Sequence, residues 1–141
     1  MSDRAHDCIF CAIASGDGPA EIVDSDDATV AFMDINPATR GHALVIPRAH
    51  SEGLFEISDD DLTASLVAAR RLAARMRETI KPDGVNILNC AGRAAWQTVF
   101  HFHLHVIPRY EDDPLQLPWI PGPVDLSQLA GVAAEIRGEA G

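Results

Sequence analysis

The chain has 141 residues, of which 47% are hydrophobic and 23% are charged, fractions typical of a soluble globular protein with one core. Its formal net charge of −10 argues against nonspecific binding to nucleic acid or to an anionic membrane. The N-terminus has no apolar signal core, no run of about 18 apolar residues occurs, and three cysteines do not make a disulfide framework. We therefore expect a cytoplasmic protein.

The first element is a short helix or turn that carries a Cys-x-x-Cys pair, Cys8 and Cys11, and ends at Gly16. Such a pair alone is compatible with a redox site, with half of a zinc site or with chance spacing. No second Cys-x-x-Cys pair follows, so a zinc ion would need two ligands from elsewhere in the chain.

The middle of the chain predicts three strands and one long helix. The strands are expected over residues 21–24, 28–35 and 41–48. Ser58, with Asp61 three residues later, is expected to cap a helix that continues to about residue 79. A further strand is expected over residues 84–90.

Three of the six histidines, His101, His103 and His105, alternate with apolar residues in the segment 99–107. In an extended strand, residues i, i+2 and i+4 point to the same face, so this segment predicts a strand with one imidazole face and one apolar face. Imidazoles spaced about 7 Å apart along a strand are a poor cage for a single metal ion, because the outer two are too far apart. They can instead hold different roles.

Residues 101–107 resemble the histidine-triad signature, His-x-His-x-His followed by two apolar residues, of the HIT family of nucleotide hydrolases and transferases. Residues 32–37, 41–48 and 97–99 match the family in the same order and near its spacing. The resemblance implies an α+β fold, with a mainly antiparallel five-stranded sheet, one long helix and short terminal helices. It also implies a single HIT domain over 1–141, with a core over about 8–110, a tail over 111–141 and a homodimer.

The resemblance also implies a role for each of several residues. His103 would be the nucleophile, His105 would contact the phosphoryl oxygens, Thr98 would protonate the leaving group and His42 would support the triad. Asp34 would bind the ribose hydroxyls, and the other positions matched to the purine nucleotide are Ile35, Phe10, Phe32, Asn89, Gln97, Thr98, Val99 and His105. From the residues alone, Phe10 and Phe32 are indistinguishable from ordinary core residues.

A structural zinc ion is the one cofactor that the resemblance implies. Several bacterial members carry zinc on positions that match Cys8, Cys11, His50 and His101, and two thiolates with two imidazoles form a suitable tetrahedral set. His101 would then be structural, and His103 and His105 would be left for the chemistry.

Trp96 departs from the family pattern, because relatives commonly have glycine there. A small residue lets backbone N–H groups approach a phosphate. Tryptophan could hold the loop differently or offer its ring to a substrate, which affects substrate choice more than reaction type.

The implied function is hydrolysis at the α-phosphate of purine nucleoside phosphoramidates or related adducts, through a covalent nucleotidyl-histidine. Dinucleoside polyphosphates are the alternative substrates, and the motif does not choose between the two. A transferase is less favoured, because no extra domain would hold a second large substrate. Two further alternatives are a non-catalytic, zinc-stapled nucleotide-binding or interaction protein and a triad whose three histidines all bind one ion.

Overall fold

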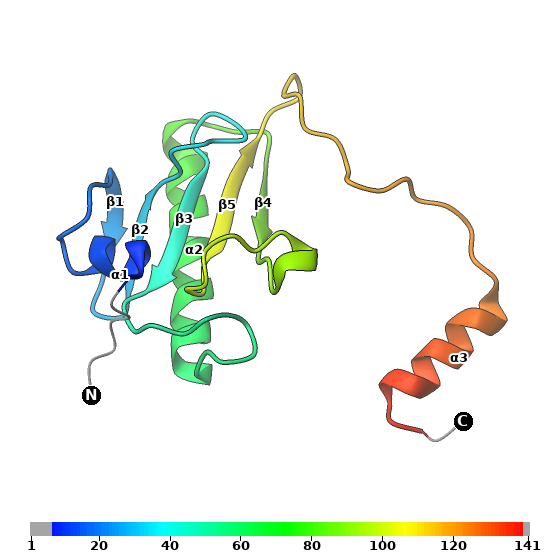
Figure 1. Ribbon diagram of the computed structural model, residues 1–141. Coiled ribbons are helices and arrows are strands. Elements are labelled where there is room, and N and C mark those ends of the chain that lie inside the picture. Colours follow the sequence, from blue (N-terminus) through cyan, green and yellow to red (C-terminus); the bar gives the residue numbers. More distant parts are fainter. Residues whose placement is uncertain (1–6, 140–141) are drawn as a thin grey trace.

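The computed structural model describes residues 7–139, and its five strands form one antiparallel sheet in the order β1-β2-β3-β5-β4 (Figure 1). The elements in chain order are α1 (Ile9–Ala14), β1 (Ile22–Ser25), β2 (Thr29–Met33), β3 (Ala43–Pro47), α2 (Asp59–Thr79), β4 (Gly84–Leu88), the short 3₁₀ helix η1 (Arg93–Ala95), β5 (Leu104–Arg109) and α3 (Leu126–Ile136). The predicted α+β fold with five antiparallel strands, one long helix and short terminal helices is confirmed.

The long helix α2 begins and ends as its sequence predicts. The Ser58 hydroxyl accepts a hydrogen bond from the Asp61 N–H at 3.1 Å, and three aspartates occupy the first turn, where the helix dipole is positive. One face of α2 buries Ala68, Ala69, Leu72 and Met76 against one face of the sheet. This packing forms the larger of two hydrophobic cores.

The opposite face of the sheet packs against α1 and forms the second core. Phe10 and Ile13 of α1 contact Val30, Phe32, Leu44 and Ile46 there. Successive residues of a strand point to opposite faces, so Ala31 and Val45 face α2 whereas their neighbours face α1. Side chains on this face of the central strands are therefore covered by α1.

The histidine segment is shorter as a strand than its sequence predicts. β5 begins at Leu104, so only His105 of the three histidines lies within the strand, and the expectation of one strand over 99–107 is wrong in this respect. Continuing the register of β3 and β5 would pair Phe102 with Pro47, but a proline has no N–H to donate, and the pairing stops at Val45 and Leu104. The expected alternation persists, because Phe102, Leu104 and Val106 pack in the core under α2.

The C-terminal segment ends in α3, where the Asp125 carboxylate caps the helix by accepting a hydrogen bond from the Ser127 N–H at 2.9 Å. The predicted short terminal helix is therefore present. Figure 1 shows α3 away from the sheet at the end of an extended linker. Of the helices within residues 7–139, not one combines the length and the apolarity that crossing a lipid bilayer requires.

Candidate functional site

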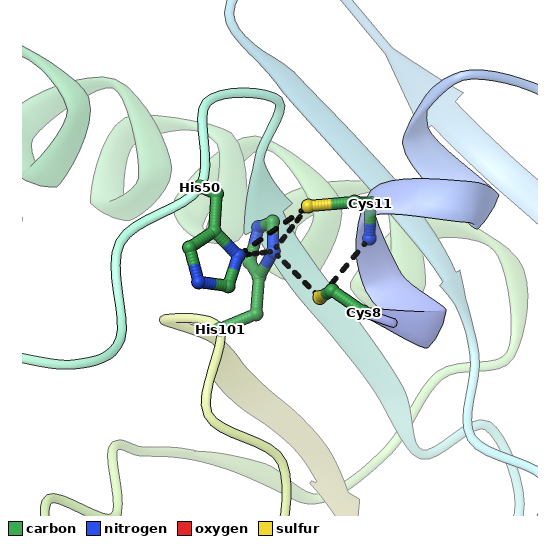
Figure 2. A group of neighbouring side chains, drawn as sticks. All are labelled: Cys8, Cys11, His50 and His101. Atoms are coloured by element: carbon green, nitrogen blue, oxygen red, sulfur yellow. Dashed lines mark hydrogen bonds between the residues drawn. The ribbon is translucent and has the colours of Figure 1, made fainter. Parts of the chain in front are cut away.

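Four metal-ligating side chains, Cys8, Cys11, His50 and His101, converge at one point beside the sheet (Figure 2). The His101 Nδ1 atom lies 3.4 Å from each of the two cysteine Sγ atoms, and the His50 Nδ1 atom lies 3.3 Å from the Cys11 Sγ atom and 3.3 Å from the His101 Nδ1 atom. Ligands on a tetrahedral zinc ion with bonds of about 2.0–2.3 Å are separated by about 3.3–3.8 Å. The cluster therefore has the donor atoms and the spacing of a Cys2His2 zinc site, and these residues fit the metal.

The backbone aims the His101 ring at this cluster. Its Nε2 atom lies 2.8 Å from the Pro47 carbonyl oxygen, which can only accept a hydrogen bond, so this nitrogen carries the proton. The other ring nitrogen, Nδ1, then presents its lone pair to the two sulfur atoms. The same proline that ends the pairing of β3 with β5 thus orients one ring of the candidate zinc site.

The His103 ring is also held by a backbone carbonyl, but through its other nitrogen. Its Nδ1 atom lies 2.8 Å from the His101 carbonyl oxygen and must therefore donate to it. In a neutral imidazole this leaves Nε2 without a proton and with a free lone pair. The Asn89 side-chain amide donates to the His103 carbonyl at 3.0 Å, and the Phe10 ring packs edge-on against the imidazole at a centroid distance of 5.2 Å.

His42 and His105 form a pair whose protons are also determined by a backbone group. The Ala38 N–H donates to His42 Nδ1 at 2.9 Å, so the proton of a neutral His42 lies on Nε2. That N–H points at His105 Nδ1, which lies 2.9 Å away, and the His105 proton must then lie on its own Nε2. His103 therefore offers a lone pair at Nε2, whereas the neighbouring His105, at a ring-centroid distance of 5.2 Å, offers an N–H at the same position.

Burial keeps these rings neutral at pH 7. Burial, together with the adjacent imidazoles of His103 and His42, lowers the pKa of His105 to about 4, because a buried charge and a second positive charge nearby are both unfavourable. Burial also lowers the pKa of His103 and of His42 from the ordinary value of 6.5. The Asp34 carboxylate, 3.4 Å from His42 Nε2, opposes part of that lowering.

The residues matched to the ribose and the base are divided between the core and the surface. Phe10 and Phe32 are 7% and 3% exposed and pack edge-to-face in the second core, so most of their surface is already used. Ile35, in contrast, is 87% exposed just after Asp34. The Asp34 carboxylate accepts from the Asn36 N–H at 2.7 Å, and Val99 packs against the core that contains Phe10.

Gln97, which the family resemblance matches to the nucleotide, makes three hydrogen bonds within the protein. Its side chain is buried, its Oε1 accepts from the Gly92 N–H at 2.8 Å, and its Nε2 donates to the carbonyls of Glu52 and Val99 at 2.7 and 3.1 Å. The amide thus ties together the backbone of the loop that leads to Thr98. Thr98 itself is exposed and lines a cavity of about 490 Å³ whose other walls are Asp7, Cys8, Ile9, His50, Val99 and Phe100.

Two parts of this site were missed by sequence reasoning. The Pro47 carbonyl and the Ala38 N–H are backbone groups, yet they determine which nitrogen of His101 and of His42 carries the proton. No pattern of residue types identifies such groups, because every residue has a carbonyl and nearly every residue has an N–H. The proline that closes the third predicted strand was the one available signal.

The fold and the site together define a small α+β protein with a Cys2His2 cluster and a linked set of histidines on one face of an antiparallel sheet. The family model described as "HIT domain" matches residues 15–112. The protein Hit of Bacillus subtilis is 43% identical over 106 residues, which cover 75% of this chain and 73% of that protein. The chain belongs to the HIT family.

Two solved structures extend the similarity to nearly the whole chain. The crystal structure of SMU.412c from Streptococcus mutans is similar with a TM-score of 0.92 and 34% identity, covering 99% of this chain and 88% of that one. A Zn-bound histidine triad family protein from Mycobacterium smegmatis is similar with a TM-score of 0.75 and 38% identity, covering 95% and 98% of the two chains.

Proposed function

We propose that this protein is a hydrolase that cleaves purine nucleoside phosphoramidates, or related nucleotidyl adducts, at the α-phosphate through a covalent nucleotidyl-histidine. The observation that carries the proposal is the hydrogen bond from His103 Nδ1 to the His101 carbonyl, because it leaves Nε2 as an unprotonated nucleophile at neutral pH. Membership of the HIT family supports the nucleotide as the substrate class.

In the proposed reaction, the His103 Nε2 lone pair forms a bond to the α-phosphorus while the bond from phosphorus to the leaving nitrogen breaks. The leaving amine takes a proton that the Thr98 hydroxyl relays from a solvent water molecule, and the His105 Nε2–H donates to a phosphoryl oxygen as negative charge builds up. A water oxygen then bonds to phosphorus as the bond from phosphorus to His103 Nε2 breaks, which releases the nucleoside monophosphate and frees the Nε2 lone pair. One proton of that water returns to solvent and balances the proton taken up by the amine. Asp34 would accept hydrogen bonds from the ribose hydroxyls, and Ile35 would contact the base.

The zinc ion has no step in this proposal. When bound by Cys8, Cys11, His50 and His101, it would join α1 to the loop after β3 and to the start of the histidine segment. His101 also supplies the carbonyl that accepts from His103, so a fixed His101 helps to keep the nucleophile in one tautomer.

His42 is expected to act through His105. Replacing His42 with phenylalanine keeps a ring but removes the N–H that is directed at His105 Nδ1, so His105 can rotate or change tautomer. Because loss of one aligned donor costs about 10²-fold or more, we expect His42→Phe to lower kcat roughly 10²-fold with little change in KM. Steady-state kinetics with an adenosine phosphoramidate provides the measurement.

His42→Gln is the matched control for this variant, since a glutamine amide can place an N–H near the position of His42 Nε2. We expect it to recover much of the lost kcat. Equal activity of the two variants would show that the hydrogen bond to His105 does not matter.

We also propose a homodimer in which α2 and the edge strand β4 meet their copies. The supporting observations are a hollow of about 660 Å³ between these two elements and the exposed apolar residues Leu66, Val67, Ile87 and Leu88. Sedimentation equilibrium is expected to give twice the chain mass for the parent protein and a monomer for Val67→Glu. Phe55→Glu, an equally drastic change at an exposed residue outside α2 and β4, should remain dimeric.

Dinucleoside polyphosphates are a second class of candidate substrates, because the same nucleophile would release a nucleotide in place of an amine. Comparing kcat/KM for adenosine phosphoramidates and diadenosine polyphosphates decides between them. Failure to cleave either class would overturn the proposed function.

A further inference from the structure

Trp96 has a backbone conformation that glycine normally adopts. Its φ and ψ are 74° and 22°, in the left-handed region where a side chain crowds the backbone. The Trp96 N–H donates to the Arg93 carbonyl and the Gln97 N–H to the Gly92 carbonyl, each at 3.0 Å. This pair of hydrogen bonds is the Schellman motif, and Trp96 is at its C′ position, where glycine is strongly favoured.

The loop around Trp96 is held by groups other than the indole. The Gln97 side chain bonds to Gly92, Glu52 and Val99, and the Gly92 carbonyl also accepts from the Ala95 N–H at 3.1 Å. The indole belongs to neither hydrophobic core and is 63% exposed. A strained conformation that the surroundings impose, with a large side chain that the fold does not use, points to a role outside folding.

The place of Trp96 in the loop, close to Thr98, suggests a role in binding the leaving group. Trp96 precedes Thr98 by two residues, so their Cα atoms are at most about 8 Å apart, a separation comparable to the length of a tryptophan side chain. Phe100, which lines the cavity next to Thr98, is 37% exposed and has the Arg93 guanidinium 5.3 Å from its ring centroid. This end of the site therefore presents exposed aromatic rings and one cation.

We propose that Trp96 is a specificity-determining residue that stacks on a planar aromatic ring in the leaving group. The inference rests on the proposed function, because Thr98 marks the side from which the leaving group departs. Stacking of a flat heterocycle on an exposed aromatic side chain typically changes binding by about 5- to 150-fold. The ring could belong to an aromatic amine or to the second nucleobase of a dinucleoside polyphosphate.

The test compares two pairs of substrates that differ only in whether the leaving group carries such a ring. One pair is the adenosine phosphoramidates of tryptamine and of butylamine, and the other is diadenosine tetraphosphate and adenosine tetraphosphate. For each pair the measured quantity is the ratio of the two kcat/KM values. We expect Trp96→Gly to lower the ratio about tenfold for at least one pair, whereas Trp96→Phe should keep most of it.

Phe55→Ala is the control, because Phe55 is also an exposed aromatic residue, at 86%, and lies in a different loop. It should leave both ratios as they are in the parent protein. Thermal unfolding supplies an independent readout, because glycine relieves the crowded backbone, and Trp96→Gly is expected to raise the unfolding midpoint by a few degrees. A lower midpoint would show that the indole is structural and would overturn the proposal.

The pair whose ratio responds identifies the source of the ring, as an aromatic amine or as a nucleobase. Unchanged ratios for both pairs in Trp96→Gly would reject the role of Trp96 while leaving the hydrolase intact. If the parent protein cleaves none of the four compounds, the proposed function itself fails, and the inference fails with it.

Discussion

Replacing His103 with alanine is expected to lower kcat for an adenosine phosphoramidate by roughly 10⁴-fold or more, because the variant lacks the only atom proposed to bond to phosphorus. The parent ring is prepared for this step by two properties. The His101 carbonyl holds the proton on Nδ1, and burial lowers the pKa of the ring below the ordinary 6.5, so Nε2 is free at pH 7. Single-turnover kinetics gives the rate of the chemical step directly.

His103→Asn is the matched variant, since its amide keeps a polar group near the position of Nδ1 but offers no nucleophile. We expect it to be inactive and, after mixing with substrate and quenching with alkali, which preserves a phosphorus–imidazole bond, to show no mass increase of one nucleotidyl group. The parent protein should show that increase transiently. Full activity of either variant would reject the assignment of His103 as the nucleophile.

Replacing Cys11 with alanine is expected to remove one zinc ion per chain and to lower the midpoint of thermal unfolding by about 10 °C or more. Cys11 is 2% exposed, and its Sγ atom lies 3.3–3.4 Å from a ring nitrogen of His50 and of His101. A structural zinc ion contributes several kcal/mol to folding, and for a chain of this size each kcal/mol corresponds to roughly 2–4 °C. Elemental analysis and calorimetry on the same sample measure both effects.

Cys90→Ala is the control for the zinc prediction, because Cys90 is also a buried cysteine but is outside the cluster. It should keep its zinc. The stoichiometry also separates the alternatives derived from the sequence. Zinc that is lost in His103→Ala but retained in Cys8→Ala would place the metal on the triad and would remove the nucleophile from the proposed reaction.

Much of the fold follows from local patterns in the chain. The Ser58 cap and the acidic first turn of α2, the proline that closes β3 and the alternation of His101, His103 and His105 with apolar residues all depend on neighbours within a few positions. The limits of the histidine strand were wrong because they depend on a distant residue. Pro47 is 55 positions before Phe102. Only the pairing of β3 with β5 places Pro47 opposite Phe102, where its lack of an N–H prevents a further hydrogen bond.

The candidate site was also predicted in part from the sequence, and the rest of it depends on the fold. The resemblance to the HIT family indicated which side chains to consider, and the structure brings Cys8, Cys11, His50 and His101 within ligand distance of one another. Residue types alone could not show which ring nitrogen of each histidine carries the proton. The hydrogen bonds of the Gln97 amide likewise depend on the fold, which places three backbone groups around it.

By itself, the sequence determined the α+β architecture, the long helix and the membership of the HIT family, because hydrophobic periodicity, capping and motif order are local properties of the chain. Only the tertiary structure decided which nitrogen of each imidazole carries a proton. That choice belongs to backbone groups of other segments, the Pro47 carbonyl for His101 and the Ala38 N–H for His42, and it separates a ring nitrogen that could bind a metal ion from one that donates a hydrogen bond. Proton positions on neutral imidazoles follow from their hydrogen-bond partners, and those partners exist only after the chain has folded.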